Sequence, residues 1–282
     1  MKRINKISIA LLVSALMVGS AFGHQGEMKF MFQFPDHLTP VLDGDMSDWD
    51  IVSDVYKIKA ENMFNQFGAP MDLSAYNIND GKAYFSAWIA DDYINNTEKW
   101  STTTDWDHSG GIFRGFDQGD DFETRWASAQ AQRYDLAGPI FSSSGYYTRI
   151  IDGTKAWAGQ PPYVEWAGQF LRGNVDTQEP AEMFGEYSIV PFDDIHPDGA
   201  DQSVQHNWVE GTVVGIEVNW GDKDADPGSY DDAYWSGFGG VGASRDADQF
   251  GDYLLAPVEE GLPEAGATGV EASTWGQIKS SF

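Results

Sequence analysis

The sequence predicts an all-β fold: a two-sheet antiparallel β-sandwich, jelly-roll-like, with long loop insertions and a short C-terminal tail. Short apolar and aromatic runs alternate with clusters of Gly, Asp, Asn and Pro, and 31 of the 282 residues are glycine. Few stretches have the spacing of an amphipathic helix, whereas several alternate apolar and polar residues as half-buried strands do. The chain is long enough to build one large core.

The first strands are predicted at residues 28–34 and 55–60, which are short runs rich in aromatic or β-branched residues. Residues 72–78 and 82–90 flank Asn79-Asp80-Gly81, whose Asp-Gly pair is typical of a tight hairpin turn. In the second strand of this hairpin every other residue is apolar, so we expect one of its faces to be buried.

Six further strands are predicted, at residues 122–129, 146–151, 164–171, 182–190, 213–220 and 252–255. The run at 213–220 alternates most clearly, because its even positions are apolar and stand opposite Gly215, Glu217 and Asn219. Pro191 is expected to end the strand that precedes it, since proline cannot donate to a strand ladder.

Two segments are expected to be long insertions between strands. Residues 95–119 are rich in Thr, Asp, Gly and Trp, and residues 153–162 are rich in Gly, Pro and Trp. Loops of this length in a compact domain are usually functional or disordered. By contrast, Trp49, Trp88 and Trp220 fall within strand or turn motifs, and we expect them in the core.

The N-terminus is expected to be a secretory signal peptide over residues 1–23, with a basic start, an apolar run and small residues before His24. The apolar run is short for a transmembrane helix, so no membrane-spanning helix is expected after cleavage. We expect the sandwich over 24–257, a linker over 258–269 and a C-terminal tail over 270–282. The protein is therefore expected in the periplasm, at the cell surface or secreted.

The charge and the lack of cysteine limit the function. The chain has 44 acidic against 17 basic residues, a formal charge of −27, and it contains no cysteine. Such an acidic protein repels nucleic acid, because phosphate binding needs a basic patch. Without cysteine there are no disulfides, no thiol catalysis and no iron–sulfur ligation, so the fold depends on its core.

Several segments occur in a family-specific order along the chain. They are an Asp-Gly turn that leads to Trp49, an aromatic strand that ends in Asp91-Asp92, an acidic strand entry at 119–123, a Glu-to-Phe segment at 186–192 and a Phe-Gly-x-x-x-Leu strand at 250–255. Together, over roughly residues 41–257, they resemble family 9 carbohydrate-binding modules and the related DOMON domains. Two departures from the family pattern are that Trp49 follows Asp48 directly and that Val190 replaces the usual isoleucine before Pro191.

The resemblance implies a two-sheet sandwich, often with bound calcium, that binds sugar chains or their ends and has no catalysis of its own. In the DOMON relatives such a sandwich binds haem instead. Haem is therefore the alternative cofactor, although the five histidines and eight methionines permit axial ligation without indicating it.

Tryptophans in or beside the insertions are candidate sugar platforms. A sugar ring packs its apolar C–H face on an indole, while charged and amide groups bind its hydroxyls. The candidate ligand-binding residues are Trp100, Trp106, Trp157, Trp166, Trp208, Arg125 and Glu165. The alternative is that these tryptophans cover the sheets as small apolar clusters.

A calcium site is predicted where Asp222, Asp224 and Asp226 place three carboxylates at alternate positions, as oxygen-liganded loops do. This loop departs from an EF-hand, since Pro227 takes the glycine position. The histidines lack the spacing of a zinc site. No nucleophile elbow, phosphate loop or dinucleotide fingerprint is present, so no catalytic residues are assigned.

The sequence thus predicts an exported, non-catalytic protein that binds poly- or oligosaccharide by sugar stacking on loop tryptophans and is stabilised by calcium. Two alternatives stay open: a DOMON-like domain that binds haem or another redox cofactor, and a structural protein of surface assembly. A polysaccharide-active enzyme also stays open, because two catalytic carboxylates across a cleft leave no signature in a chain with 44 acidic residues.

Overall fold

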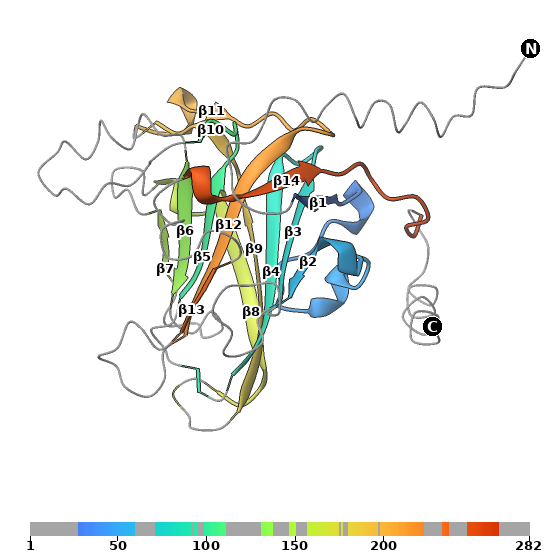
Figure 1. Ribbon diagram of the computed structural model, residues 1–282, viewed down its shortest axis with the longest axis vertical. Helices are drawn as coiled ribbons and strands as arrows, with labels where there is room; N and C mark the ends of the chain where they lie inside the picture. The colour runs from blue at the N-terminus through green and yellow to red at the C-terminus, as the bar shows by residue number, and fades with distance from the viewer. Residues whose placement is uncertain are drawn as a thin grey trace, which may run out of the picture.

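Two β-sheets packed face to face form the computed structural model of this chain (Figure 1). The structure describes residues 28–59, 71–91, 93–94, 99–110, 131–137, 147–150, 157–174, 176, 180–196, 198–222, 233–236 and 247–264. The predicted all-β sandwich is confirmed. In the part of the chain that the structure describes, no helix is long and apolar enough to cross a membrane.

We call the two layers sheet A and sheet B, and they are joined in the strand order β7-β6-β5-β12-β14-β1-β3-β4-β9-β8. Sheet A contains β7 (Tyr147–Ile150), β6 (Gln132–Ala137), β5 (Lys99–Asp105), β12 (Val213–Asp222), β14 (Gly251–Leu255) and, paired with β12, β13 (Ala233–Ser236). Sheet B contains β3 (Met71–Asn77), β4 (Lys82–Asp91), β9 (Ala181–Ile189), β8 (Val164–Arg172) and, paired with β3, β2 (Lys57–Lys59). A separate small ladder pairs β10 (Phe192–Asp194) with β11 (Val204–Gln205).

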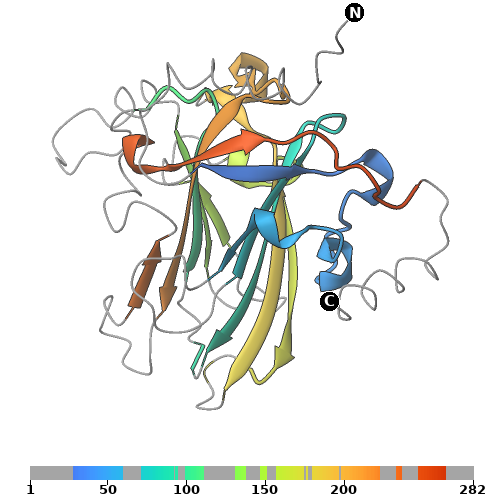
Figure 2. The same ribbon diagram turned by 45° about the vertical axis from the view of Figure 1, so that its right-hand side comes forward.

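Strand β1 (Lys29–Gln33) belongs to both sheets. Its first half pairs with β14 in sheet A, where Phe30 stands opposite Leu254, and its second half pairs with β3 in sheet B. Both pairings are parallel, in contrast to the antiparallel pairing of the other strands. In Figure 2 the first and last strands lie side by side and run across the upper ends of the long strands.

The core lies between the two sheets. From sheet B, Phe85 and Tyr187 stack with their ring centroids 5.0 Å apart, and Trp100 of sheet A meets Tyr187 edge-on at 4.7 Å. The Tyr187 hydroxyl also donates to the hydroxyl of Thr102, which joins the two layers by a buried polar contact. Apolar residues of β12, including Val218 and the predicted core residue Trp220, complete this layer.

A second apolar cluster covers the outer face of sheet B. It is made by the N-terminal segment, where Phe32, Phe34 and Trp49 pack edge-on with one another and with Tyr56 and Tyr84. Three short 3₁₀ turns shape this segment: η1 (Asp36–Leu38), η2 (Met46–Trp49) and η3 (Asp54–Tyr56). Two further turns are η6 (Ala200–Gln202) and η8 (Ala247–Gln249).

Glu186 of β9 fixes this segment to sheet B. Its carboxylate accepts the backbone N–H groups of Asp43 and Gly44, at 2.9 and 2.7 Å, and the indole N–H of Trp49, at 2.9 Å. Burial raises the pKa of Glu186, and these three hydrogen bonds oppose that rise. A buried carboxylate therefore connects two of the sequence motifs, the Asp-Gly-to-Trp turn and the segment that begins at residue 186.

Most predicted strands are confirmed, including the hairpin at Asn79-Asp80-Gly81 and the core positions of Trp49 and Trp220. The predicted strand at 122–129 lies outside the described residues. The prediction of a loop insertion at 95–119 is wrong for residues 99–105, which form strand β5 and pair with both β12 and β6 in the middle of sheet A. The run of Ser and Thr in this segment is typical of a loop in the sequence, but both faces of the strand are buried.

The expected signal peptide and C-terminal tail lie outside the described residues. Within the expected linker, residues 258–264 continue along the N-terminal segment rather than leaving it. Leu262 packs against the second apolar cluster, and a ring nitrogen of His37 is hydrogen-bonded to the Pro263 carbonyl at 2.7 Å.

Gly44 gives a test of how closely the Asp-Gly turn packs on sheet B. Its φ is +84°, and a Cβ added there would lie 3.0–3.3 Å from backbone atoms of Gly168. We expect Gly44→Ala to lower the free energy of unfolding by about 2–4 kcal/mol, because both left-handed strain and a backbone clash arise. Urea unfolding measures this loss.

The matched control is Gly211→Ala, where φ is +80° but no heavy atom lies within 4 Å of the added Cβ. This variant should lose only about 1 kcal/mol, from backbone strain alone. Equal losses in the two variants would show that the contact with Gly168 is unimportant.

Candidate functional site: the polar face of sheet A

Strand β5 has an apolar face and a polar face, both buried. Trp100 and Trp106 are directed into the core, together with Thr102 and Thr104. The alternate residues Ser101, Thr103 and Asp105 therefore lie on the opposite face of sheet A, and each is at most 2% exposed. Sequestering a carboxylate and two hydroxyls in this way costs free energy unless they find polar partners.

The neighbouring strands add polar groups to the same face. In the ladder, Glu217 of β12 and Arg133 of β6 stand on either side of Thr103, and Asn219 stands opposite Ser101. Directly opposed side chains have Cβ atoms about 4.5–5.5 Å apart, so these groups are within reach of one another. We call the set Ser101, Thr103, Asp105, Arg133, Glu217 and Asn219 the polar face of sheet A.

Hydrogen bonds join several side chains of the polar face. The Arg133 guanidinium donates to the Ser101 hydroxyl at 3.0 Å, and the Asn219 amide donates to Glu217 at 3.2 Å. The Thr103 hydroxyl is fully buried and has no hydrogen-bond partner. Buried polar groups are nearly always satisfied, so the unpartnered hydroxyl between Arg133 and Glu217 makes this face a candidate position for a further polar group.

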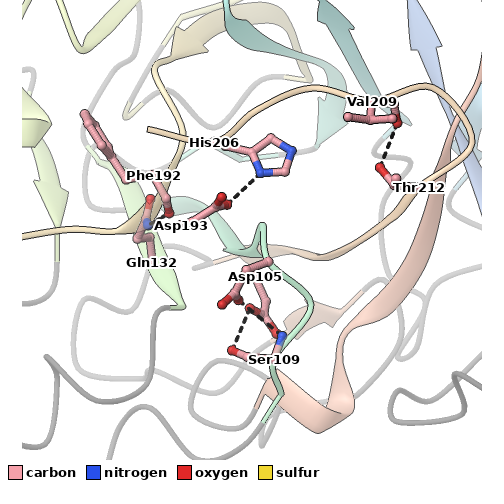
Figure 3. Close-up of polar contacts among 9 residues, drawn as sticks. Asp105, Ser109, Gln132, Phe192, Asp193, His206, Val209 and Thr212 are labelled. Carbon is pink, nitrogen blue, oxygen red and sulfur yellow. Dashed lines mark hydrogen bonds and ion pairs between the residues drawn. The ribbon is translucent and has the colours of Figure 1, made fainter. Parts of the chain in front are cut away.

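Asp105 closes a short loop at the end of β5. Its carboxylate accepts the Gly110 N–H at 2.7 Å and the Ser109 hydroxyl at 3.4 Å, as Figure 3 shows for Ser109. Burial, and then a hydrogen bond with Asp107, raises the pKa of Asp105 to about 7, while the bond from Gly110 opposes this. A carboxyl that titrates near neutral pH inside a polar cluster is typical of functional sites.

A contact between a histidine and a carboxylate lies at the edge of this face. His108, in the same loop, contacts the Asp252 carboxylate at 2.9 Å. Asp252 of β14 is opposite Gly215, which is itself opposite Asp105. The face therefore extends across β6, β5, β12 and β14.

The structure places three of the predicted sugar-stacking tryptophans inside the protein. Trp100 and Trp106 are each 2% exposed and Trp208 is 7% exposed. Trp106 and Trp208 pack on each other and on the His206 ring, with centroids 4.8–5.9 Å apart. No flat indole face of these three residues is open to a sugar ring in this conformation.

His206 is held within this aromatic group by Asp193. Its Nδ1 is 2.6 Å from the Asp193 carboxylate, as Figure 3 shows, and its Nε2 and the Trp106 indole nitrogen are buried without a hydrogen-bond partner. The side chain of Gln132 reaches the carbonyl of Phe192 beside it. These contacts fix the β10–β11 ladder against the end of the core.

The other predicted ligand-binding residues do not gather at one place. Trp157 is partly buried beside Tyr163 and Phe192 and donates to the His196 carbonyl at 3.0 Å. Trp166 packs against the core from β8. Glu165, the residue before it, forms an ion pair with Lys82 at 2.6 Å.

The side chains of four predicted site residues are not among those that the structure describes. Arg125, Asp224 and Asp226 lie outside the described residues, and Asp222 ends β12 opposite Ala233. Across the described ranges, no group of three or more His, Asp or Glu residues could hold a metal ion.

The sequence predicts only part of the polar face of sheet A. The alternation at 213–220 predicts that Glu217 and Asn219 share one face of a strand. Such a face is normally solvated, so no binding role is predicted for these two residues. The same alternation in Ser101, Thr103 and Asp105 was the missing signal, and it becomes readable once residues 99–105 are recognised as a strand.

Two solved structures of a family 9 carbohydrate-binding module from Caldicellulosiruptor kristjanssonii share this fold. The module in complex with cellotriose has a TM-score of 0.51 and 12% identity, over 84% of this chain and 98% of the module. The module in complex with glucose has a TM-score of 0.50 and 12% identity, over 84% of this chain and all of the module. The chain is therefore a β-sandwich like the family 9 modules, and its sequence matches no family model and no curated protein.

The raised pKa of Asp105 predicts how the stability of the protein depends on pH. Its pKa rises from an ordinary 3.8 to about 7 on folding, so between these values the native state binds a proton that the unfolded state lacks. Stability contributed by this group is therefore present at low pH and is lost as the pH rises toward 7. In Asp105→Asn we expect the decline from pH 4.5 to 7.5 to be shallower by about 1–3 kcal/mol, from urea unfolding.

The control is Asp201→Asn, which removes a surface-exposed carboxylate in η6. It should keep the slope of the unmodified protein. The interpretation of Asp105 fails if Asp105→Asn and the unmodified protein decline in parallel.

Proposed function

We propose that this protein binds carbohydrate through the polar face of sheet A, without catalysing a reaction. One observation carries the proposal: carboxylate, amide, guanidinium and hydroxyl groups converge on one sheet face around the unpartnered hydroxyl of Thr103. Sugars present many hydroxyls that donate and accept hydrogen bonds, and a mixed set of fixed polar groups matches them. The likeness in fold to modules solved with cellotriose and glucose supports this choice of ligand.

Each member of the polar face has a definite role in this proposal. Glu217 and Asp105 accept hydrogen bonds from sugar hydroxyls, and Arg133 donates to hydroxyl or ring oxygens. Asn219 can donate and accept, and Thr103 gains the partner that it lacks in the free protein. Because members such as Thr103 and Glu217 are fully buried, binding requires the face to open, so association should be slower than diffusion.

The proposal depends on hydrogen bonding and does not require a tryptophan platform. Trp100, Trp106 and Trp208 are buried, and the partly buried Trp157 and Trp166 belong to other parts of the fold. Release of reducing ends from a bound oligosaccharide would contradict the non-catalytic role.

Thr103→Val tests the site with little risk to the fold. Valine keeps the shape of threonine, and the hydroxyl that it removes has no partner in the free protein. We expect unchanged or slightly higher stability, and about tenfold weaker binding of the best oligosaccharide found in a glycan screen, measured by calorimetry. Glu217→Gln should weaken binding by a similar or larger factor, because charged hydrogen bonds are stronger.

The matched control is Glu165→Gln, which removes a carboxylate on β8 that is 45% exposed and paired with Lys82. It should bind like the unmodified protein. Oligosaccharide binding that is unaffected by Thr103→Val and Glu217→Gln would place the site elsewhere, and a screen without any bound glycan would refute the proposed function.

We also propose that calcium stabilises the protein through Asp222, Asp224 and Asp226, which the sequence places at alternate positions. Calcium at millimolar concentration is expected to raise Tm by several degrees, because an ion that binds only the native state stabilises it by mass action. Chelation should reverse the rise, and a variant with Asp224→Asn and Asp226→Asn should not respond. The same rise in that variant would assign the calcium to other ligands.

A further inference from the structure

The outer face of sheet A, to which the polar face belongs, is buried in its middle and open at its β1 end. Thr103 of β5 and Glu217 of β12 are fully buried, whereas Phe30 of β1 is 37% exposed. Between them lies Asp252 of β14, whose side chain is 14% exposed. In Figure 2 the strands β1 and β14 of this open end lie side by side. A ligand can therefore reach the β1 end of the outer face before it reaches the buried middle.

The strand registers place Phe30 in a short apolar row. Phe30 stands opposite Leu254 of β14, and Leu254 stands opposite Val213 of β12. Residues opposite each other in a ladder share a face of the sheet, and so do alternate residues of one strand. Val213 is four residues before Glu217, so the apolar row lies on the same face as the polar groups. Leu254 and Val213 are each partly exposed, and the row is therefore open to a ligand.

Polar groups lie directly beside this apolar row. Asp252 is two residues before Leu254 in β14, which separates the two by about 6.6 Å along one face of the strand. The His108 ring donates a hydrogen bond to the Asp252 carboxylate at 2.9 Å, because a carboxylate only accepts. A carboxylate has acceptor positions for several donors, so Asp252 can accept a ligand hydroxyl in addition to His108.

From this arrangement we infer that the open end of the outer face is a subsite for a pyranose sugar, whose ring packs on Phe30 while a hydroxyl donates to Asp252. The inference rests on the proposed function and specifies where the accessible sugar ring is held. A pyranose ring has an apolar C–H face and a rim of hydroxyls, so it suits an aromatic ring next to a carboxylate. A wholly apolar partner would bury Asp252 without a donor, which costs free energy.

The test uses tetramers of β-1,4-linked glucose, xylose and mannose, together with the best oligosaccharide from a glycan screen. The three tetramers are uncharged, so the net charge of −27 does not attract them. For the ligand that binds most tightly, we expect Phe30→Leu to weaken binding about tenfold, because leucine stays apolar but offers no flat ring. Phe30→Trp should bind at least as tightly as the unmodified protein. Calorimetry measures both affinities.

The matched control is Leu171→Ala, which removes an apolar side chain that is 42% exposed on β8 of sheet B. It should bind like the unmodified protein. Urea unfolding separates binding from folding, and the two Phe30 variants should unfold near the urea concentration of the unmodified protein, since Phe30 is exposed. Equal weakening of binding in Phe30→Leu and Phe30→Trp would assign Phe30 a packing role and overturn the inference.

Asp252→Asn tests the polar half of the subsite. Asparagine keeps a side-chain oxygen for His108, so the contact with the loop after β5 can persist. We expect about tenfold weaker binding, because hydrogen bonds to a charged acceptor are stronger than those to an amide. Asp201→Asn, which changes an exposed carboxylate in η6, should leave the affinity unchanged. Full affinity in Asp252→Asn would contradict the role of this carboxylate.

A nuclear magnetic resonance measurement reports the stacking itself. Protons that lie over an aromatic ring are shifted upfield by its ring current. We expect the C–H protons of one sugar residue to shift upfield on binding, and this shift should be lost in Phe30→Leu and kept in Phe30→Trp. A shift that persists in Phe30→Leu would place the sugar on another aromatic residue and would overturn the inference.

The failures of the two proposals differ. Binding that is weakened by Thr103→Val but by no variant of Phe30 or Asp252 would overturn the subsite and leave the proposed function in place. Binding that is weakened by Phe30→Leu but not by Thr103→Val or Glu217→Gln would support the subsite and remove the buried middle of the face from the site. If no tetramer binds and the glycan screen is also negative, both proposals fall.

Discussion

The buried carboxylate of Glu186 connects the parts of this fold that are far apart in sequence. It accepts three N–H groups from a turn more than 130 residues earlier in the chain, and in doing so holds the N-terminal segment on the outer face of sheet B. That segment supplies the aromatic cluster around Phe34 and Trp49 that shields the sheet from water. A buried acidic group is stable only when it is paired or hydrogen-bonded, so the turn and the sheet depend on each other.

Each sheet buries a carboxylate beside an unpartnered hydroxyl. On sheet B, each oxygen of Glu186 has a described hydrogen-bond donor, and the Ser86 hydroxyl opposite Glu186 in the ladder has no partner. On sheet A, Asp105 accepts hydrogen bonds from the loop that follows β5, and Thr103 has no partner. What distinguishes the proposed site is the set of polar side chains that neighbouring strands place around Thr103.

The sequence was sufficient where local chemistry decides the structure. The Asp-Gly turn defined the β3–β4 hairpin, and the alternation of β12 defined its apolar face, which lies in the core. It was insufficient for β5, where tryptophans at either end of a Ser-Thr run resembled a loop with exposed aromatic residues. Whether Trp100 and Trp106 are buried depends on strands that are distant in sequence, such as β9 with Tyr187, and no local pattern contains that information.

The parallel pairing of β1 with β14 has a consequence for how the protein is made. These strands are separated by more than 200 residues, yet they form the join between the two sheets. During synthesis β1 is made long before β14, so the first half of β1 has no strand to pair with. Strand β12 is also made before β14, its neighbour in sheet A. The join therefore closes last, after nearly the whole chain has emerged, and the unpaired edges must avoid other chains until then.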